Sequence, residues 1–145
     1  MKHNYQLLLV TKQDIILKVI DKDDMAYPAQ EGGILIEDVL KTADFISSLD
    51  NLNVVGVTGF PCALYDFEER TINASSNLHT IIKAAELLDS KLGIDIKHIN
   101  APGSSSCESM EVIASYGATD AEPGSAIWGM AMQQIYGTDV GTPAQ

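Results

Sequence analysis

The feature that most constrains the fold is an alternation of short β-branched apolar runs with longer segments of helical periodicity. Residues 15–20 (IILKVI) have the length and side chains of a buried strand. Residues 77–92 instead carry apolar side chains three and four positions apart, the spacing of one helix face. The order of strand and helix recurs at residues 15–20, 36–49, 53–58, 77–92, 94–100, 106–116 and 118–121. Strands that alternate with helices form a parallel sheet, so we predict an α/β fold.

The number of strand–helix units limits the architecture. The chain has 145 residues, which suits one domain with about four such units. A complete (β/α)8 barrel needs about 250 residues, so the pattern predicts either a partial (half) TIM-type barrel or a small open sheet. Between these units, residues 59–66 indicate a loop and residues 67–76 an exposed excursion, while residues 5–10 fit a strand or the end of a helix.

Two polar loops follow the last strands of this pattern. Residues 101–106 are small and hydroxyl-rich and precede a predicted helix, an arrangement that suits a phosphate group. Residues 121–126 place Glu122 and Gly124 after the next predicted strand, at the same end of the sheet. Either loop alone also has a plain structural interpretation, because serines commonly cap helices and Pro-Gly commonly forms a turn.

Charge and cysteine content narrow the class of protein. The formal net charge of −11 argues against nucleic acid or an anionic membrane as the main partner, because both need a basic surface. We find no leader pattern and no apolar run of membrane-spanning length. Cys62 and Cys107 are isolated, and the three histidines have no ligand spacing, so we expect a cytoplasmic, reduced protein without a metal site.

Four short motifs, in this order and spacing, carry a resemblance to a known family. They are residues 27–33 (YPAQEGG), 56–62 (GVTGFPC), 100–103 (NAPG) and 122–126 (EPGSA). Together they resemble the later part of the barrel of the alanine-racemase-like (fold type III), pyridoxal-phosphate-dependent family, and within it a subgroup of uncharacterised amino-acid racemase-like proteins of the YhfX type. The resemblance implies a partial barrel domain over residues 1–129, with residues 130–145 as a divergent C-terminal tail.

The resemblance also implies a role for individual residues. The cofactor-binding positions that it assigns are Asn100, Gly103, Ser104, Ser105, Glu122, Gly124, Ser125 and Thr58. Glu122 matches the residue that faces the pyridine nitrogen, and a carboxylate there keeps this nitrogen protonated, which makes the ring a strong electron sink. The other loop residues match positions that bind the cofactor phosphate, and Thr58 is a neighbour of the ring.

This chain departs from the family pattern in three places. The Schiff-base lysine of the family lies on the first barrel strand, whereas Lys18 matches a later strand, so we assign no catalytic lysine here. Gly59 stands where family racemases often place a histidine against the ring. The residues left as candidates for the substrate side are Tyr27, Gln30 and Cys62. A small buried core residue is the interpretation of Cys62 that we favour, and Tyr27 and Gln30 fit a plain loop equally well. After Gly129 the sequence no longer follows the subgroup.

These features predict a fragment of a pyridoxal 5′-phosphate-dependent amino-acid racemase-like protein that is inactive by itself. We expect its partners to be a small amino acid in the intact protein and a second chain, through homo-oligomerisation or through pairing at open sheet edges. One alternative is a non-catalytic α/β module that binds a small phosphorylated ligand or a partner chain. A further alternative is a truncated gene product without a function of its own.

Overall fold

A computed structural model describes residues 12–122 and residue 124, and a four-stranded parallel sheet forms its centre. The strands, in their order across the sheet, are β2 (Ile34–Leu35), β1 (Gln13–Ile20), β3 (Leu52–Thr58) and β6 (His98–Asn100). Beyond β6, Asn100 forms an isolated parallel bridge with Asp120. The strands β1, β3 and β6 and the bridge at Asp120 therefore lie side by side in the order of the chain. All of these pairs are parallel, which agrees with the predicted α/β fold.

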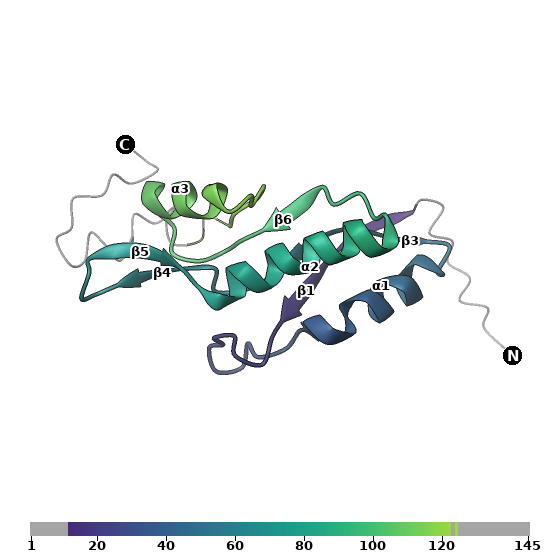
Figure 1. Cartoon of the computed structure of the whole chain (residues 1–145), viewed down its shortest axis with the longest axis horizontal. Helices are drawn as coiled ribbons and strands as arrows, with labels where there is room; N and C mark the ends of the chain where they lie inside the picture. The colour runs from purple at the N-terminus through teal and green to yellow at the C-terminus, as the bar shows by residue number, and fades with distance from the viewer. Residues whose placement is uncertain (1–11, 123, 125–145) are drawn as a thin grey trace, which may run out of the picture.

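Two helices cover one face of this sheet (Figure 1). The short 3₁₀ helix η1 (Ile36–Asp38) leads into α1 (Val39–Ser47), and α2 (Ser76–Leu92) lies beside α1 across β1 and β3. Their buried side chains share one core with those of the strands; this core includes Leu17, Val19, Val39, Val57, Leu78, Ile81 and Leu88. Because side chains alternate along a strand, burial of Leu17 and Val19 under the helices puts Ile16 and Lys18 on the opposite, open face.

Local sequence explains where the helices begin and end. The predicted helix at residues 77–92 is confirmed as α2, and it ends at Gly93, whose φ of 64° is the left-handed conformation that glycine adopts without strain. The helix α3 (Cys107–Ser115) begins after Ser106, whose side chain accepts from the Ser109 backbone while the Ser109 side chain accepts from the Ser106 backbone. Part of the serine-rich loop is therefore a helix cap.

The prediction of a loop and an exposed excursion at residues 59–76 was wrong in part. The strands β4 (Ala63–Asp66) and β5 (Thr71–Ala74) pair there as an antiparallel hairpin. Ala63, Tyr65 and Ile72 are buried, with the two-residue period of strands that face a core on one side. The α3 helix packs on this hairpin (Figure 1), and the Glu108 carboxylate accepts hydrogen bonds from the Thr71 hydroxyl and the Ile72 backbone.

The last two predicted strands are shorter than expected. The strand predicted over residues 94–100 is reduced to His98–Asn100, and the one predicted over residues 118–121 to the bridge at Asp120. Ile94 and Ile96 still pack against the core, so their apolar pattern reflects burial without a hydrogen-bonded ladder. The predictions for residues 5–10 and for the tail at residues 130–145 lie outside the described residues.

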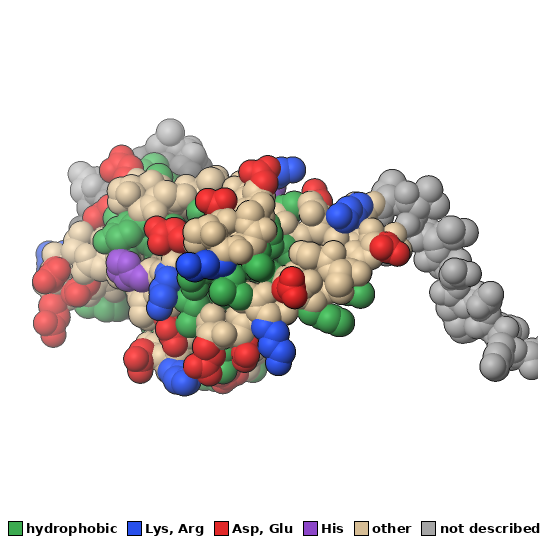
Figure 2. Space-filling model, turned by 45° about the vertical axis from the view of Figure 1, so that its right-hand side comes forward, with side chains coloured by type: hydrophobic (Ala, Val, Ile, Leu, Met, Phe, Trp, Pro, Cys, Tyr) green, Lys and Arg blue, Asp and Glu red, His purple; other side chains and the backbone are tan. Residues whose placement is uncertain are grey.

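The visible surface agrees with the acidic composition. Figure 2 shows acidic side chains spread over the face in view, with basic and hydrophobic groups between them and without a continuous basic surface. Within residues 12–122 and 124, no helix combines the length and apolar character needed to cross a membrane.

Candidate functional site

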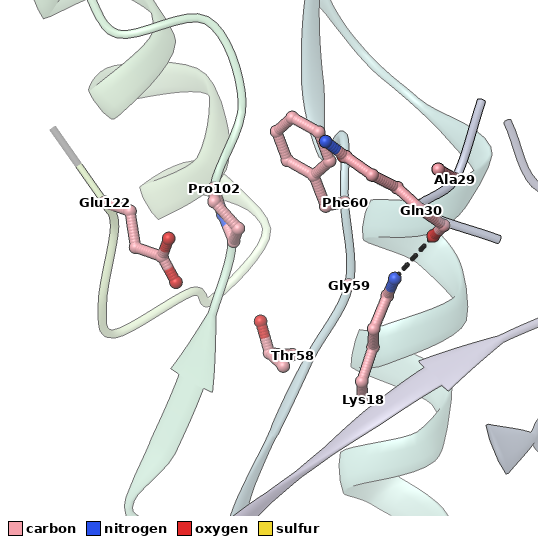
Figure 3. Close-up of a pocket in the computed structure, with 8 residues that line it drawn as sticks. All are labelled: Lys18, Ala29, Gln30, Thr58, Gly59, Phe60, Pro102 and Glu122. Carbon is pink, nitrogen blue, oxygen red and sulfur yellow. Dashed lines mark hydrogen bonds between the residues drawn. The ribbon is translucent and has the colours of Figure 1, made fainter. Parts of the chain in front are cut away.

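A cavity of about 570 Å³ opens at the carboxyl ends of the central strands (Figure 3). Its lining residues are Lys18, Ala29, Gln30, Thr58, Gly59, Phe60, Pro102 and Glu122. This volume is in the range of sites for small molecules. The carboxyl ends of parallel strands are also where α/β folds place their ligands. The cavity is therefore our candidate site, and it includes Gln30, Thr58 and Glu122 from the residues that the sequence predicted.

The register of the strands sets the polar floor of the cavity. Lys18 of β1 pairs with Thr58 of β3, which pairs with Asn100 of β6. Register partners in a parallel sheet project to the same face, so the three side chains form one row on the open face. The preceding row on that face contains Ile16, Gly56 and His98, and Gly56 leaves room for His98, because a Cβ on Gly56 would lie 2.3 Å from the His98 carbonyl oxygen.

Asn100 connects this row to Glu122. Its Nδ2 donates to Glu122 Oε1 at 2.7 Å and to Thr58 Oγ1 at 3.2 Å. The Ser105 hydroxyl also donates to the Glu122 backbone carbonyl at 3.4 Å. In Figure 3 the Glu122 carboxylate extends from one wall toward Thr58. The carboxylate is thus directed into the cavity by an amide, and it remains exposed to solvent.

Lys18 lies on the wall opposite Glu122 (Figure 3). Its Nζ donates to the Gln30 backbone carbonyl at 2.7 Å, and the side chain is half-buried. The sequence places Lys18 on a strand and assigns it no catalytic role. The signal for its position was present in the alternation of β1, because two buried neighbours, Leu17 and Val19, place Lys18 on the other face at the carboxyl end of the strand.

Asn77, which sequence reasoning missed, joins two walls of the cavity. This fully buried side chain donates from Nδ2 to the Met25 carbonyl at 3.0 Å and to the Phe60 carbonyl at 3.2 Å, and its Oδ1 accepts from the Met25 backbone at 3.2 Å. Tyr27 contacts the Phe60 ring, with centroids 5.5 Å apart. Asn77 therefore fixes the loop that carries Tyr27 and Gln30 against the loop that carries Phe60.

Cys62 is part of the core and does not line the cavity. It has no exposed surface, and its Sγ donates to the Gly59 carbonyl at 3.4 Å. Burial, and secondarily the charge of Asp24, raise the pKa of the Cys62 thiol to about 12. A thiol in this environment stays protonated, and Cys62 is the small buried core residue that we favoured from the sequence.

The loop predicted to hold a phosphate packs against the β4 strand. The Ser104 backbone N–H donates to the Ala63 carbonyl at 2.8 Å, and a Cβ on Gly103 would lie 2.6 Å from the Ala63 backbone nitrogen. The N–H groups of Gly103 and Ser105 have no partner within residues 12–122 and 124. Of this loop, Pro102 lines the cavity and Ser105 is buried, while Gly124 is exposed and Ser125 lies outside the described residues.

A second polar pair lies one row before the pair of Asn100 and Glu122. His98 Nδ1 is 3.0 Å from Asp120 Oδ2, and the Thr119 hydroxyl donates to the same oxygen at 2.6 Å. The Thr119 hydroxyl, followed by His98, lowers the pKa of the Asp120 carboxyl. Within the described part of the chain, His, Cys, Asp and Glu side chains form no group of three or more that could hold a metal ion.

Comparison with known proteins identifies one informative relative. No protein-family model matches this chain. The chain is similar to a curated protein of Escherichia coli (strain K12), "Uncharacterized protein YhfX", with 40% identity over 117 residues. The matched region covers 81% of this chain and 30% of the relative. The chain therefore spans less than a third of the length of a relative whose own name assigns it no activity.

Proposed function

We propose that this chain forms about half of a (β/α)8 barrel and contributes part of a pyridoxal 5′-phosphate site in an amino-acid racemase-like protein. Two features of the sheet support the barrel. The strands β1, β3 and β6 are neighbours in chain order, with the two-residue strand β2 on the other side of β1, and α1 and α2 cover the same face. A doubly wound sheet would instead carry helices on both faces.

The observation that carries the proposal is the position of Glu122. Its carboxylate projects into a cavity at the carboxyl ends of the strands and is held by Asn100 at 2.7 Å. A fixed carboxylate fits a protonated pyridine nitrogen, to which it would present a charged hydrogen-bond acceptor. When bound, pyridoxal phosphate supplies an electron sink for the charge that develops at an amino-acid α-carbon. In this assignment Glu122 holds the ring nitrogen, Asn100 orients Glu122, and Thr58 borders the ring.

The phosphate side fits the residues in part. The N–H groups of Gly103 and Ser105, which have no partner among the described residues, are suitable donors, and the Ser104 hydroxyl would add a third. The N–H of Ser104 is already donated to Ala63, so this backbone group is not assigned to the phosphate. Gly124 and Ser125 remain assigned from the family resemblance. We propose that Asn100 belongs to the ring side of the site, because its amide is committed to Glu122 and Thr58.

The activity of the longer protein is part of the same proposal. Its substrate would be an amino acid that loses its α-proton, and its other barrel strands would supply the lysine that holds the cofactor. We propose that these strands come from the rest of the barrel, in the same or a partner chain, and meet this chain at the open edges of its sheet. This chain alone is expected to bind the cofactor without catalysing racemisation.

A titration with pyridoxal 5′-phosphate tests the proposal. We expect saturable binding that Glu122→Ala weakens by about tenfold or more, because a charged hydrogen bond is lost. The matched control is Glu111→Ala, which removes an exposed carboxylate on α3 and should leave the dissociation constant unchanged. Equal binding by the wild type and Glu122→Ala would contradict the assigned role of Glu122.

Borohydride reduction followed by intact-mass analysis tests the absence of a covalent lysine. We expect no single stoichiometric adduct. One defined adduct at Lys18 would show that the chain carries the lysine that we place elsewhere. If the wild type does not bind the cofactor at all, the proposal fails, and a module that binds a partner chain becomes the better interpretation.

A further inference from the structure

Lys18 is a cation in the cavity wall with spare hydrogen-bonding capacity. Its ammonium group can donate three hydrogen bonds, and the Gln30 carbonyl takes one of them at 2.7 Å. The backbone N–H groups of Glu31 and Ala29, and to a smaller extent the charge of Lys18, lower the pKa of the Glu31 carboxyl, so Glu31 interacts with Lys18 electrostatically. Within residues 12–122 and 124, however, no carboxylate forms a direct ion pair with Lys18; the two ion pairs there are Lys22–Glu37 and His98–Asp120. The Gln30 carbonyl therefore directs the ammonium group and leaves it able to donate to a ligand.

The charge balance of the chain makes Lys18 a suitable site for an anion. The residue is half-buried and lines the same cavity as Gly59 and Phe60, while its ammonium group remains accessible to a ligand. The whole chain has a net charge of −11, so an anionic ligand must rely on a local donor of this kind. Figure 3 shows Lys18 and Glu122 on opposite walls, with Thr58 between them on the cavity floor.

The position of the loop at residues 101–106 distinguishes between two anionic groups that Lys18 could bind, a phosphate and a carboxylate. The donors suited to a phosphate, Gly103 and Ser105, follow Pro102 on the wall that carries Glu122. Lys18 lies across the cavity from that wall. A ligand with its ring nitrogen at Glu122 and its phosphate at the loop would leave Lys18 for a further anionic group, and the α-carboxylate is the anionic group that an amino acid brings to the site.

We propose that Lys18 binds the α-carboxylate of the amino-acid substrate and is a specificity-determining residue of the site. The inference rests on the proposed function, since it assumes that the cofactor ring lies at Glu122. It assigns to Lys18 a role in substrate recognition that is separate from any covalent bond. The Gln30 carbonyl acts as a positioning group that holds the ammonium in place through the 2.7 Å hydrogen bond.

Two stable conjugates of the cofactor test this inference by titration calorimetry. Phosphopyridoxyl-glycine carries an α-carboxylate, and phosphopyridoxyl-methylamine lacks only that group; neither can react with a lysine. We expect the wild type to bind the glycine conjugate at least about tenfold more tightly, the size of effect given by a hydrogen bond to a charged group. In Lys18→Met this preference should disappear, and in Lys18→Arg it should be retained in part because the charge remains.

Lys22→Met is the matched control, since it removes an exposed lysine that pairs with Glu37 outside the cavity. It should keep the wild-type preference for the glycine conjugate. If Lys18→Met keeps that preference, or if the wild type binds both conjugates equally, the inference is wrong while the cofactor proposal stands. If the wild type binds neither conjugate, the cofactor proposal itself fails and this inference fails with it.

A third ligand, pyridoxyl-glycine without its phosphate, separates the carboxylate from the phosphate. We expect Lys18→Met to weaken the binding of pyridoxyl-glycine and of the phosphorylated conjugate by the same factor. If the substitution weakens only ligands that carry the phosphate, then Lys18 binds the cofactor phosphate, and the carboxylate assignment is overturned.

Discussion

A single 2.7 Å hydrogen bond joins the amide of Asn100 to the carboxylate of Glu122. Asn100 belongs to the edge strand β6, whereas Glu122 comes two residues after the bridge at Asp120. The same amide nitrogen also donates to Thr58 of β3 at 3.2 Å. The Asn100 side chain therefore links two strands and the segment after α3. A substitution of Asn100 should directly alter the orientation of the Glu122 carboxylate.

We expect Asn100→Asp to weaken cofactor binding by about tenfold or more. The substitution removes the donor to Glu122 and places a second carboxylate beside it, which turns the attractive contact into a repulsion between like charges. Asn51→Asp makes the same change of charge at an exposed position and should bind pyridoxal phosphate as the wild type does. Equal dissociation constants for the two variants would exclude this role of Asn100.

We expect Asn77→Ala to destabilise the protein by about 2–3 kcal/mol, because a fully buried side chain is truncated and the Phe60 and Met25 backbone groups lose their hydrogen-bond partners. Chemical denaturation measures this change, and hydrogen exchange of the Met25 amide should become faster. Asn73→Ala is the control, since this exposed side chain makes one long 3.5 Å contact, and its effect should stay within about 0.5 kcal/mol. A stability loss without faster exchange at Met25 would mean that Asn77 does not hold this loop.

Gly103→Ala should cost about 1–3 kcal/mol of stability. The new Cβ would lie 2.6 Å from both the nitrogen and the oxygen of the Ala63 backbone, and a backbone cannot yield as a flexible side chain does. The matched control is Gly32→Ala, since a Cβ there would have no neighbour within 4 Å. Thermal or chemical unfolding of the two variants compares them, and equal stability would show that the loop does not pack on β4 as described.

The two cysteines should differ sharply in reactivity. Because the pKa of the Cys62 thiol is about 12, roughly one molecule in ten thousand carries the Cys62 thiolate at pH 8. Cys62 is also buried, whereas Cys107 is exposed to the reagent. Brief alkylation with iodoacetamide should therefore add one group to the native protein and two groups in guanidinium chloride. The variant Cys107→Ser should add none in the native state, and rapid native labelling of Cys62 would contradict its burial.

The contribution of Asp120 to stability should depend on pH with a definite sign. Its pKa is lowered from 3.8 in the folded protein, first by the Thr119 hydroxyl and then by His98, so these contacts favour the ionised carboxylate. The stabilisation is complete above pH 3.8 and is lost as the pH falls through the lowered pKa. Asp120→Asn should therefore be less stable than the wild type at pH 7, with a gap that narrows in acid.

Denaturant unfolding measured from about pH 2.5 to about pH 7 checks this trend, because this range includes the pKa of an aspartate. The control is Asp50→Asn, an exposed change after α1 whose stability difference from the wild type should not follow the same pH profile. A gap that stays constant over the whole range for Asp120→Asn would show that Thr119 and His98 do not favour the ionised form.

Hydrophobic periodicity correctly predicted the longer elements, in which one face is buried along the whole length. The helix α2 lies within one residue of its predicted bounds, because Leu78, Ile81 and Leu88 form one apolar stripe. The hairpin of β4 and β5 was missed because its strands have four residues each, which gives too few alternations to distinguish them from a loop. Of the strand predicted at residues 118–121, the structure forms one bridge, because strand propensity does not indicate how many residues of a neighbouring strand are available for pairing.

The candidate site was predictable only where its residues follow strands. Thr58 and Glu122 were expected at the carboxyl ends of strands, and both line the cavity. Lys18 could have been found from the alternation of β1, as noted above. Asn77 had no such signal, because its partners Met25 and Phe60 are distant in the sequence and reach it only through the fold.

The order of strands and helices, the acidic charge and the polar loops could be predicted from the sequence, because each depends on neighbouring residues and on periodicity. The shared row of Lys18, Thr58 and Asn100, the hydrogen bond from Asn100 to Glu122 and the packing of the predicted phosphate loop on Ala63 became visible in the folded chain. Register, side-chain pairing and packing join residues far apart in the chain, and local propensity carries no information about which distant backbone will be their partner.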